Sequence, residues 1–182
     1  MKKKIVITGG LGYIGTELCK LYSGVSWHHK IIVIDNRFIS ERVNQIRNWN
    51  IEFIQGDILD KNLIKGYCED ADVIHHLAGI TDVPRIKTEA SKDKDNRIKE
   101  VAEKGTQNIL EVISNKCKII FPSTHVVFEG INEVKKDISE NESTNPVLSY
   151  SSSKAVNEDQ IKRSGKNYVI LRLGSVYGYS ND

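Results

Sequence analysis

The chain has 182 residues, of which 39% are hydrophobic and 27% charged, an ordinary balance for a globular domain with a sizeable core. Its formal net charge of +2 is too small to indicate binding to nucleic acid or to a membrane surface. No stretch approaches the roughly 20 apolar residues of a membrane span, and the apolar run at residues 5–7 is far too short for a secretion signal. The three cysteines, Cys19, Cys68 and Cys117, have no metal or redox spacing. We therefore expect a cytoplasmic protein with reduced cysteines and no metal site.

Short apolar runs alternate with longer amphipathic segments along the first half of the chain. Residues 4–8 (KIVIT) are typical of a buried strand, and a helix follows in which Ile14, Leu18 and Leu21 share one face. Asp60 is suited to cap the start of a later, short helix. In chain order, the first half predicts strand 4–8, helix 13–23, strand 30–35, helix 39–49, strand 51–55, helix 60–68 and strand 72–77.

The second half continues the same alternation with one long interruption. A polar stretch from residue 88 to 97 leads into a helix that ends near residue 114, and residues 118–121 (KIIF) predict a fifth strand. Residues 130–149 are polar and poor in strand formers, so they predict a long loop. The last predicted elements are a helix at 150–162 and a sixth strand at 168–173.

Strands that alternate with helices indicate a parallel sheet covered on both faces. With right-handed crossovers, six such strands predict the order 3-2-1-4-5-6. We therefore expect an α/β fold of the Rossmann type, a doubly wound parallel sheet in three layers, that occupies residues 1–182 as one domain.

A glycine-rich loop, residues 8–15 (TGGLGYIG), joins the first predicted strand to the first predicted helix. In that context it indicates a dinucleotide-binding loop. Gly9 permits a tight turn, Gly12 lets the backbone approach a pyrophosphate, and Gly15 lets the helix pack closely on the sheet. The amides of the first helical turn then face the phosphates. The spacing is GxxGxxG, and no Lys-Ser or Lys-Thr pair follows, as a nucleoside-triphosphate loop would require.

Acidic and small residues at later strand ends fit the same ligand. Asp35 ends the second strand 20 residues after Gly15, where a carboxylate can accept hydrogen bonds from ribose hydroxyls and repel a 2′-phosphate. NAD is therefore favoured over NADP, although the neighbouring Arg37 leaves NADP as the alternative. Asp57 follows the third strand, where it can reach an adenine amino group or cap a turn. Small residues at 77–79 (LAG) let a dinucleotide lie across the strand ends.

Tyr150 and Lys154 open the last predicted helix in a YxxxK arrangement, so both side chains lie on one helix face. A tyrosine that works near neutral pH needs its pKa lowered from about 10 by roughly 3 units, or about 4 kcal/mol. A nearby ammonium and the positive charge of oxidised nicotinamide both favour the phenolate. Alone such a pair is a common surface feature, but after a dinucleotide loop it becomes the catalytic candidate. Lys154 can also hold the nicotinamide ribose.

Hydroxyl and imidazole groups lie near the presumed chemistry. Ser123 and Thr124 follow the fifth strand, and either hydroxyl can bind the reacting alcohol or ketone. His125 is the nearest histidine, but its side chain can equally face the loop. We interpret His75 and His76, at the end of the fourth strand, as core or cleft-rim residues.

Taken together, these motifs resemble the extended short-chain dehydrogenase/reductase family, specifically its NAD-dependent sugar-nucleotide epimerases and dehydratases. The motifs that carry the resemblance are TGGLGYIG at 8–15, GDI at 56–58, HLAG at 76–79, GTQNILE at 105–111, STHVVF at 123–128, YSSSK at 150–154 and LRLGSVYG at 171–178. The resemblance implies the catalytic residues Thr124, Tyr150 and Lys154. It implies cofactor contacts from Gly9, Gly12, Tyr13, Ile14, Gly15, Asp35, Asn36, Asp57, Ile58, Leu77, Ala78, Gly79 and Lys154.

By that analogy, Tyr150 removes a proton from a sugar hydroxyl while a hydride passes to NAD, and an epimerase returns the hydride to the other face of a transient ketose. Departures from the family pattern bear on the substrate. His125 and Val126 stand where dehydratases carry an Asp-Glu pair, and Val126 also lacks the carboxylate of the related decarboxylases. Further departures are Ala102 and Ser175, where asparagine is frequent, and Phe128, where tyrosine is frequent.

We therefore expect a sugar-nucleotide epimerase with NAD as cofactor and a nucleotide sugar as substrate. The alternatives are an NAD(P)-dependent reductase or dehydrogenase of the same family and a non-catalytic, dinucleotide-sensing regulator. Family members continue past the sixth strand into a smaller substrate domain, whereas this chain stops at Asp182. We thus expect a truncated form that binds NAD but turns over sugar nucleotides slowly. The family's usual homodimer, formed through the fourth and fifth helices, is a further expectation.

Overall fold

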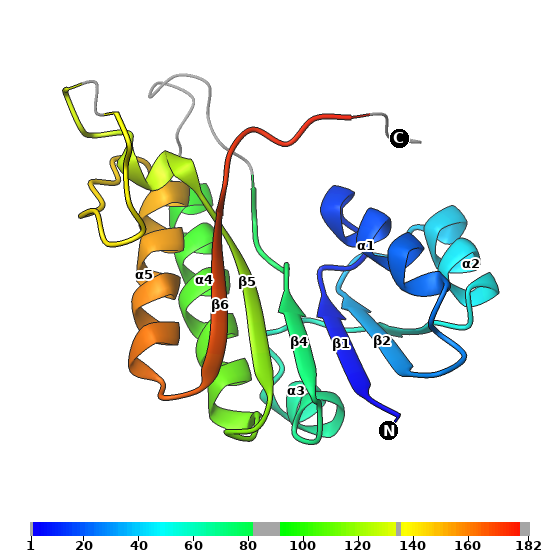
Figure 1. Cartoon of the computed structure of the whole chain (residues 1–182). Helices are drawn as coiled ribbons and strands as arrows, with labels where there is room; N and C mark the ends of the chain where they lie inside the picture. Colours follow the sequence, from blue (N-terminus) through cyan, green and yellow to red (C-terminus); the bar gives the residue numbers. More distant parts are fainter. Residues whose placement is uncertain (1, 82–91, 134–135, 179–182) are drawn as a thin grey trace.

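The computed structural model describes residues 2–81, 92–133 and 136–178. Its centre is a six-stranded parallel sheet in the order β3-β2-β1-β4-β5-β6, which confirms the predicted strand order (Figure 1). The strands are β1 (Lys4–Thr8), β2 (Lys30–Asp35), β3 (Glu52–Gln55), β4 (Val73–His76), β5 (Lys118–Thr124) and β6 (Asn167–Leu173). The helices are α1 (Tyr13–Ser23), α2 (Ser40–Asn48), α3 (Lys61–Cys68), α4 (Lys92–Val112) and α5 (Ser149–Arg163), with a short 3₁₀ helix, η2 (His125–Phe128).

Helices cover both faces of the sheet and produce two hydrophobic clusters. Ile5 and Ile7 of β1 pack with residues of α1 and α2, whereas Val6 between them packs with residues of α3, α4 and α5. This division follows from the alternation of side chains along a strand. Figure 1 shows the corresponding grouping, with α1 and α2 apart from α3, α4 and α5. The three-layered Rossmann-type fold is therefore confirmed.

The start of α3 also agrees with the sequence. The Asp60 side chain accepts hydrogen bonds from the backbone N–H groups of Asn62 and Leu63, which satisfies two donors that the helix itself cannot pair.

Strand β5 is longer than predicted and continues through Pro122, a residue that normally interrupts a central strand. The amide of Lys118 donates to the carbonyl of Asp72, so alternate residues of β5, including Pro122, face the β4 side. The pairing with β4 ends at Ile120, so the missing N–H of Pro122 costs no hydrogen bond in the sheet. On its other edge β5 stays paired with β6 as far as Thr124. The strand therefore carries Thr124 beyond the end of β4.

The predicted loop at 130–149 is confirmed for the residues that the structure describes there, up to the start of α5. Its ends are tied together, since the Gly130 amide donates to the Asn145 carbonyl at 2.8 Å and the Asn145 amide donates to the Val127 carbonyl at 2.9 Å. The expected polar segment before α4 lies outside the described residues as far as residue 91. In the described part of the chain, no helix has the length and apolar character of a membrane span.

All three cysteines are buried and free, as expected. Burial raises the pKa of the Cys19 and Cys68 thiols to about 12 and that of Cys117 to about 11. They are therefore poor nucleophiles at neutral pH and serve as small apolar core residues.

Candidate active site

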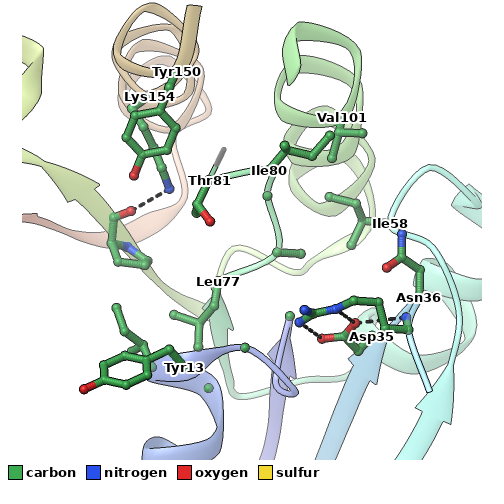
Figure 2. A pocket seen from close by; sticks show the side chains of 18 of the residues that line it. Tyr13, Asp35, Asn36, Ile58, Leu77, Ile80, Thr81, Val101, Tyr150 and Lys154 are labelled. Atoms are coloured by element: carbon green, nitrogen blue, oxygen red, sulfur yellow. Dashed lines mark hydrogen bonds and ion pairs between the residues drawn. The ribbon is translucent and has the colours of Figure 1, made fainter. Parts of the chain in front are cut away.

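A cleft of about 660 Å³ opens at the carboxyl ends of the strands. Figure 2 shows Tyr150 and Lys154 on one side of it and Asp35 and Asn36 on the other, with Leu77, Ile80 and Thr81 between them. The cleft brings together all the residues that the sequence predicted for cofactor binding or catalysis. These are Gly9, Gly12, Tyr13, Ile14, Gly15, Asp35, Asn36, Asp57, Ile58, Leu77, Ala78, Gly79, Thr124, Tyr150 and Lys154. Their individual roles stay predictions.

Gly9 makes the turn from β1 into the loop with a positive φ of 70°, a conformation that favours glycine. A Cβ at this position would lie 2.6 Å from the backbone nitrogen of Ala78 and 2.7 Å from its Cα. The loop therefore crosses the end of β4 so closely that no side chain fits.

Gly15 is tightly packed for a different reason from the one predicted. A Cβ there would lie 2.6 Å from the Cα of Gly10 and from the carbonyl oxygen of Gly9, so the close contact is with the loop rather than with the sheet. Helix α1 follows directly after Gly12, whose carbonyl accepts the amide of Thr16. The amides of the first turn have no acceptor within the helix and lie at the positive end of its dipole, which suits an anion.

The middle of the loop is held by groups from β2 and α2. The Leu11 amide donates to Asp35 Oδ2 at 3.0 Å, and Arg42 donates to the Leu11 carbonyl. The Leu11 side chain is fully buried. Asp35 therefore shapes the loop as well as facing the cleft, a role that the sequence analysis missed because it depends on contact between β2 and the loop.

The geometry around Asp57 is compatible with both roles expected of it, a contact with an adenine amino group and the cap of a turn. Its Oδ1 accepts the Leu59 amide at 3.0 Å, which caps a turn, while Oδ2 accepts Asn36 Nδ2 at 3.1 Å. Arg97 of α4 reaches to 3.8 Å from the same Oδ2 and pairs with Glu100 at 2.7 Å. Arg97 lines the cleft but was missed, because a basic residue on the polar face of a helix carries no distinguishing sequence signal.

Lys154 is held at the far side of the cleft by the extension of β5. Its Nζ donates to the Pro122 carbonyl at 2.8 Å and lies 4.5 Å from the centroid of the Phe121 ring (Figure 2). The carbonyl is available because β4 has ended. Burial lowers the pKa of Lys154 to about 8, so the ammonium form still predominates at neutral pH.

Tyr150 lies one helical turn before Lys154, whose Nζ is 6.0 Å from the centroid of its ring. The expected lowering of the phenol's pKa does not occur in this state. Burial instead raises the pKa of Tyr150 above its ordinary value, because the phenolate would lose its contact with water.

The structure distinguishes the two hydroxyls at the end of β5. The Ser123 hydroxyl donates to the buried Glu158 Oε1 at 2.6 Å and is thus committed to the packing of α5. The Thr124 Oγ1 accepts the Val126 amide at 3.2 Å, a bond that leaves its own proton available for donation. Thr124 is therefore the better candidate to bind a reacting oxygen.

The histidines of the fourth strand belong to the core. His75 and His76 are buried, and the two ring nitrogens of His76 lie 2.9 Å from the hydroxyls of Thr8 and Thr106. Burial, with the nearby Lys154 charge, lowers the pKa of His76 to about 3, so it stays neutral. His125 is exposed on η2, with a ring nitrogen 3.2 Å from a backbone carbonyl of β6.

The segment after β6 adds a wall that the sequence did not predict. Residues 174–178 run across the carboxyl ends of the strands toward α1 (Figure 1). Gly174 and Val176 line the cleft. A Cβ at Gly178 would lie 3.2 Å from the Tyr13 hydroxyl oxygen, which places the end of the segment beside the start of α1.

Comparison with known proteins agrees with this arrangement. The model of the 3-beta hydroxysteroid dehydrogenase/isomerase family matches residues 6–179. The chain belongs to this family. It is thus an extended short-chain dehydrogenase/reductase, as its motifs indicated.

Several relatives of the chain are named as enzymes that act on nucleotide sugars. It is 33% identical to a putative UDP-glucose 4-epimerase of Methanocaldococcus jannaschii, over 98% of this chain and 57% of the relative. It is 29% identical to the dTDP-D-glucose 4,6-dehydratase of Dictyostelium discoideum, over 97% of this chain and 44% of the relative.

A solved structure with a similar fold is the UDP-glucuronic acid 4-epimerase of Bacillus cereus in complex with UDP-glucuronic acid and NAD. It has a TM-score of 0.73 and 28% identity, over 93% of this chain and 55% of that one. The chain thus spans about half the length of the proteins it matches.

Proposed function

We propose that this chain is the NAD-binding domain of a sugar-nucleotide epimerase. The observation that carries the proposal is a single cleft lined both by the glycine loop and by Thr124, Tyr150 and Lys154. The names of the relatives support the nucleotide sugar as the substrate class.

The residues of the cleft fit NAD. The first-turn amides of α1 and the bare backbone at Gly12 would hold the pyrophosphate. Asp35 would accept the hydroxyls of the adenosine ribose, and Asp57 and Ile58 would lie beside the adenine. The small residues at 77–79 would leave the dinucleotide room to cross the strand ends toward Lys154. Bound NAD supplies a hydride acceptor that can also return the hydride.

Three side chains would handle the proton during oxidation of the sugar. As the C–H hydride leaves, Tyr150 accepts the proton of the hydroxyl on the same carbon, so the alcohol becomes a ketone. Thr124 donates a hydrogen bond to that sugar oxygen and orients it. The Lys154 ammonium stabilises the phenolate before the proton arrives. Because burial raises the pKa of Tyr150 in the free protein, we expect the phenol to become an effective base only when a further positive charge is present.

Epimerisation also requires the reverse step on the opposite face of the sugar. The ketose must turn in the cleft, and the hydride must return from the other side. Tyr150 then gives its proton back to the sugar oxygen, so the complete cycle produces no net oxidation. The same tyrosine thus acts first as a base and then as an acid.

A dehydrogenase or reductase is the second candidate, because the matching family model describes hydroxysteroid dehydrogenases. It would use the same three side chains once, without returning the hydride. A 4,6-dehydratase is less well supported, since His125 and Val126 replace the acidic pair that eliminates water, and His125 is exposed on η2.

The test uses the purified chain with NAD and UDP-glucose deuterated at the carbon that carries the reacting hydroxyl. An epimerase yields the epimer with deuterium retained and no net accumulation of NADH, whereas a dehydrogenase accumulates NADH. The reaction is followed under single-turnover conditions, so that a slow conversion is also detected. Tyr150→Phe should abolish the reaction and spare NAD binding. Full activity in that variant would refute the proposed role of Tyr150.

A further inference from the structure

Glu129, the residue that follows η2, is bound to the start of helix α5. Its Oε1 accepts the backbone amides of Val147 and Leu148, each at 2.7 Å, and it also accepts the Ser151 hydroxyl. These donors lie on either side of Tyr150 in the chain, since Leu148 is the N-cap residue of α5 and Ser151 belongs to its first turn. A single carboxylate oxygen thus fixes the backbone that carries the candidate base.

The start of α5 depends on this contact because it has no cap of its own. The side chain of its N-cap residue, Leu148, makes no capping hydrogen bond, and the first turn contains no acidic residue. In a capping box, the amide of the N-cap residue is bound by a side chain of the same helix. Here Glu129 supplies that bond from a different segment, and its negative charge suits the positive end of the helix dipole.

Glu129 is in turn held at a fixed place relative to Thr124. The two residues flank η2, in which Val127 is fully buried. At the start of η2, Thr124 Oγ1 accepts the Val126 amide at 3.2 Å. At its end, the Glu129 amide donates to the Val126 carbonyl at 3.1 Å. The short helix therefore acts as a spacer between the catalytic candidate Thr124 and the carboxylate that holds α5.

Two further contacts fasten the same part of the molecule. The Gly130 amide donates to the Asn145 carbonyl, and Asn145 Nδ2 donates back to the Gly130 carbonyl, both at 2.8 Å. A Cβ at Gly130 would lie 2.6 Å from the Asn145 carbonyl oxygen, so the two backbones meet without room for a side chain. One turn after Tyr150, Lys154 is anchored on the Pro122 carbonyl (Figure 2). Helix α5 is therefore fastened on both sides of Tyr150, by Lys154 after it and by the Glu129 contacts around it.

We propose that Glu129 is a positioning residue for the reaction, which sets the distance between the Tyr150 phenol and the Thr124 hydroxyl. Glu129 lies outside the set of described residues that line the cleft, so it acts through the backbone of α5. Both side chains must reach the same sugar oxygen, and a displacement of about 1 Å can slow a reaction on the order of 100-fold. Lys154 has its own anchor, so loss of Glu129 should disturb proton transfer more than NAD binding. This inference rests on the proposed function, because it assumes that Tyr150 and Thr124 act on a substrate.

The test compares the wild-type chain with Glu129→Ala in two measurements. Single-turnover hydride transfer is followed with NAD and UDP-glucose, and calorimetry gives the dissociation constant of NAD. We expect the rate constant to fall about 10- to 100-fold, whereas the NAD dissociation constant should change by less than about twofold. Because Glu129 is exposed, its substitution leaves the hydrophobic core intact and the variant should fold.

Two conservative variants separate the position of the acceptor oxygen from its charge. Glu129→Gln keeps an acceptor oxygen at the same reach without the charge, and it should restore the rate to within about threefold of the wild type. Glu129→Asp keeps the charge but is one methylene shorter, so its carboxylate cannot reach all three donors. It should react about as slowly as Glu129→Ala. A rate restored by Glu129→Asp and not by Glu129→Gln would show an effect of charge and overturn the proposal.

Asp60→Ala is the matched control for stability. It removes a carboxylate that accepts two amides at the start of α3, a helix from which no described residue lines the cleft. Its melting temperature should fall about as much as that of Glu129→Ala, because each variant loses the cap of one helix. Its hydride transfer should be unchanged. If Asp60→Ala slows the reaction as much as Glu129→Ala does, the effect of Glu129 is one of stability alone and the proposal fails.

Hydrogen exchange, read by mass spectrometry, tests the contact without any turnover. The amides of residues 147–151 should exchange about tenfold faster in Glu129→Ala than in the wild type, and unchanged exchange there would overturn the proposal. A wild-type chain that binds NAD but transfers no hydride refutes the proposed function, and the role of Glu129 falls with it. A wild type that reacts, with a Glu129→Ala variant that reacts equally fast, refutes the role of Glu129 alone.

Discussion

At the scale of the residue, Lys154 shows how a functional charge opposes the stability of the fold. Its ammonium donates to the Pro122 carbonyl and faces the Phe121 ring, and burial lowers its pKa from 10.5 to about 8. The folded state therefore binds this proton more weakly than the unfolded state does. The resulting cost in folding free energy is fully present below pH 8. It disappears as the pH rises from the pKa of Lys154 in the folded state toward its pKa in the unfolded state.

We expect Lys154→Met to stabilise the free protein by roughly 1 to 3 kcal/mol near pH 7, because it removes a buried charge and keeps an apolar stem. The gain should shrink as the pH rises above 8, where the wild type itself loses the proton. Urea unfolding at neutral and alkaline pH measures both effects. Lys99→Met, at an exposed site of α4, is the matched control and should show no such pH dependence. A Lys154→Met protein that is less stable than wild type at neutral pH would contradict this account.

Tyr150 gives the second prediction at this scale. Burial raises its pKa in the free protein, so its phenolate should appear only above the ordinary range near 10. Addition of NAD brings a cationic nicotinamide and should lower that pKa, whereas NADH, with a neutral ring, should not. The measurement is an ultraviolet difference titration of wild type against Tyr150→Phe. Equal curves with NAD and NADH would argue against Tyr150 as the base.

At the scale of the element, a buried carboxylate holds helix α5 against strands β5 and β6. Glu158 lies one turn after Lys154, and it accepts the Ser123 hydroxyl of β5 at 2.6 Å and Arg172 Nη2 of β6 at 2.7 Å. Burial acts to raise the pKa of Glu158, but the bonds from Arg172 and Ser123 hold it below its usual value. The Arg172 guanidinium also lies 5.1 Å from the centroid of the Phe128 ring in η2. The helix that carries Tyr150 and Lys154 is thereby positioned relative to Thr124.

We expect Glu158→Gln to lower the free energy of unfolding by about 3 kcal/mol, because Arg172 is then left mostly buried without its counter-charge. Ser123→Ala removes a single hydrogen bond from the same carboxylate and should cost about 1 kcal/mol. Urea unfolding of both variants at neutral pH makes the comparison. If Glu158→Gln costs no more than Ser123→Ala, the ion pair does not hold the junction together.

At the scale of the whole molecule, the cleft is built from two groups of elements on either side of β1 and β4. The glycine loop, α1 and β2 supply one wall, and β5, α5 and the segment 174–178 supply the other. A dinucleotide that spans the cleft would contact both walls and so stabilise the fold as a unit. Binding to the native state alone adds a free energy that grows with the logarithm of ligand concentration.

We expect NAD at about 100 times its dissociation constant to stabilise the chain by about 2.7 kcal/mol, which corresponds to a rise in melting temperature of roughly 5 to 10 °C. Differential scanning calorimetry measures it. Tyr150→Phe should keep the full shift, because the phenol acts on the substrate. Gly9→Ala should lose it, since its Cβ would collide with the backbone of Ala78 and displace the loop. An NAD shift that survives in Gly9→Ala would contradict the assignment of the loop.

Local patterns alone were enough to predict much of this protein. The alternation of apolar runs and amphipathic segments predicted six strands and their order, and the Asp60 cap was predicted from its position before a helical pattern. The glycine loop was recognised because the turn after β1 needs residues without side chains, a demand set by the backbone itself. Spacing and strand ends likewise indicated Asp35, Tyr150 and Lys154, whereas the full set of candidate site residues came from the resemblance to the family.

Only the tertiary structure decided which contacts form between residues that are distant in the chain. Pro122 continues β5 because β4 has already ended beside it, and the carbonyl freed there receives Lys154. Ser123 and Thr124 are equivalent by type, yet the buried Glu158 engages only the first. The Leu11 amide bonds to Asp35 because β2 ends beside the glycine loop, 24 residues away in the chain. The sequence pattern shows which polar groups are available. Packing determines which of these groups are buried and which hydrogen-bond partners they contact, and this determines the chemistry of the cleft.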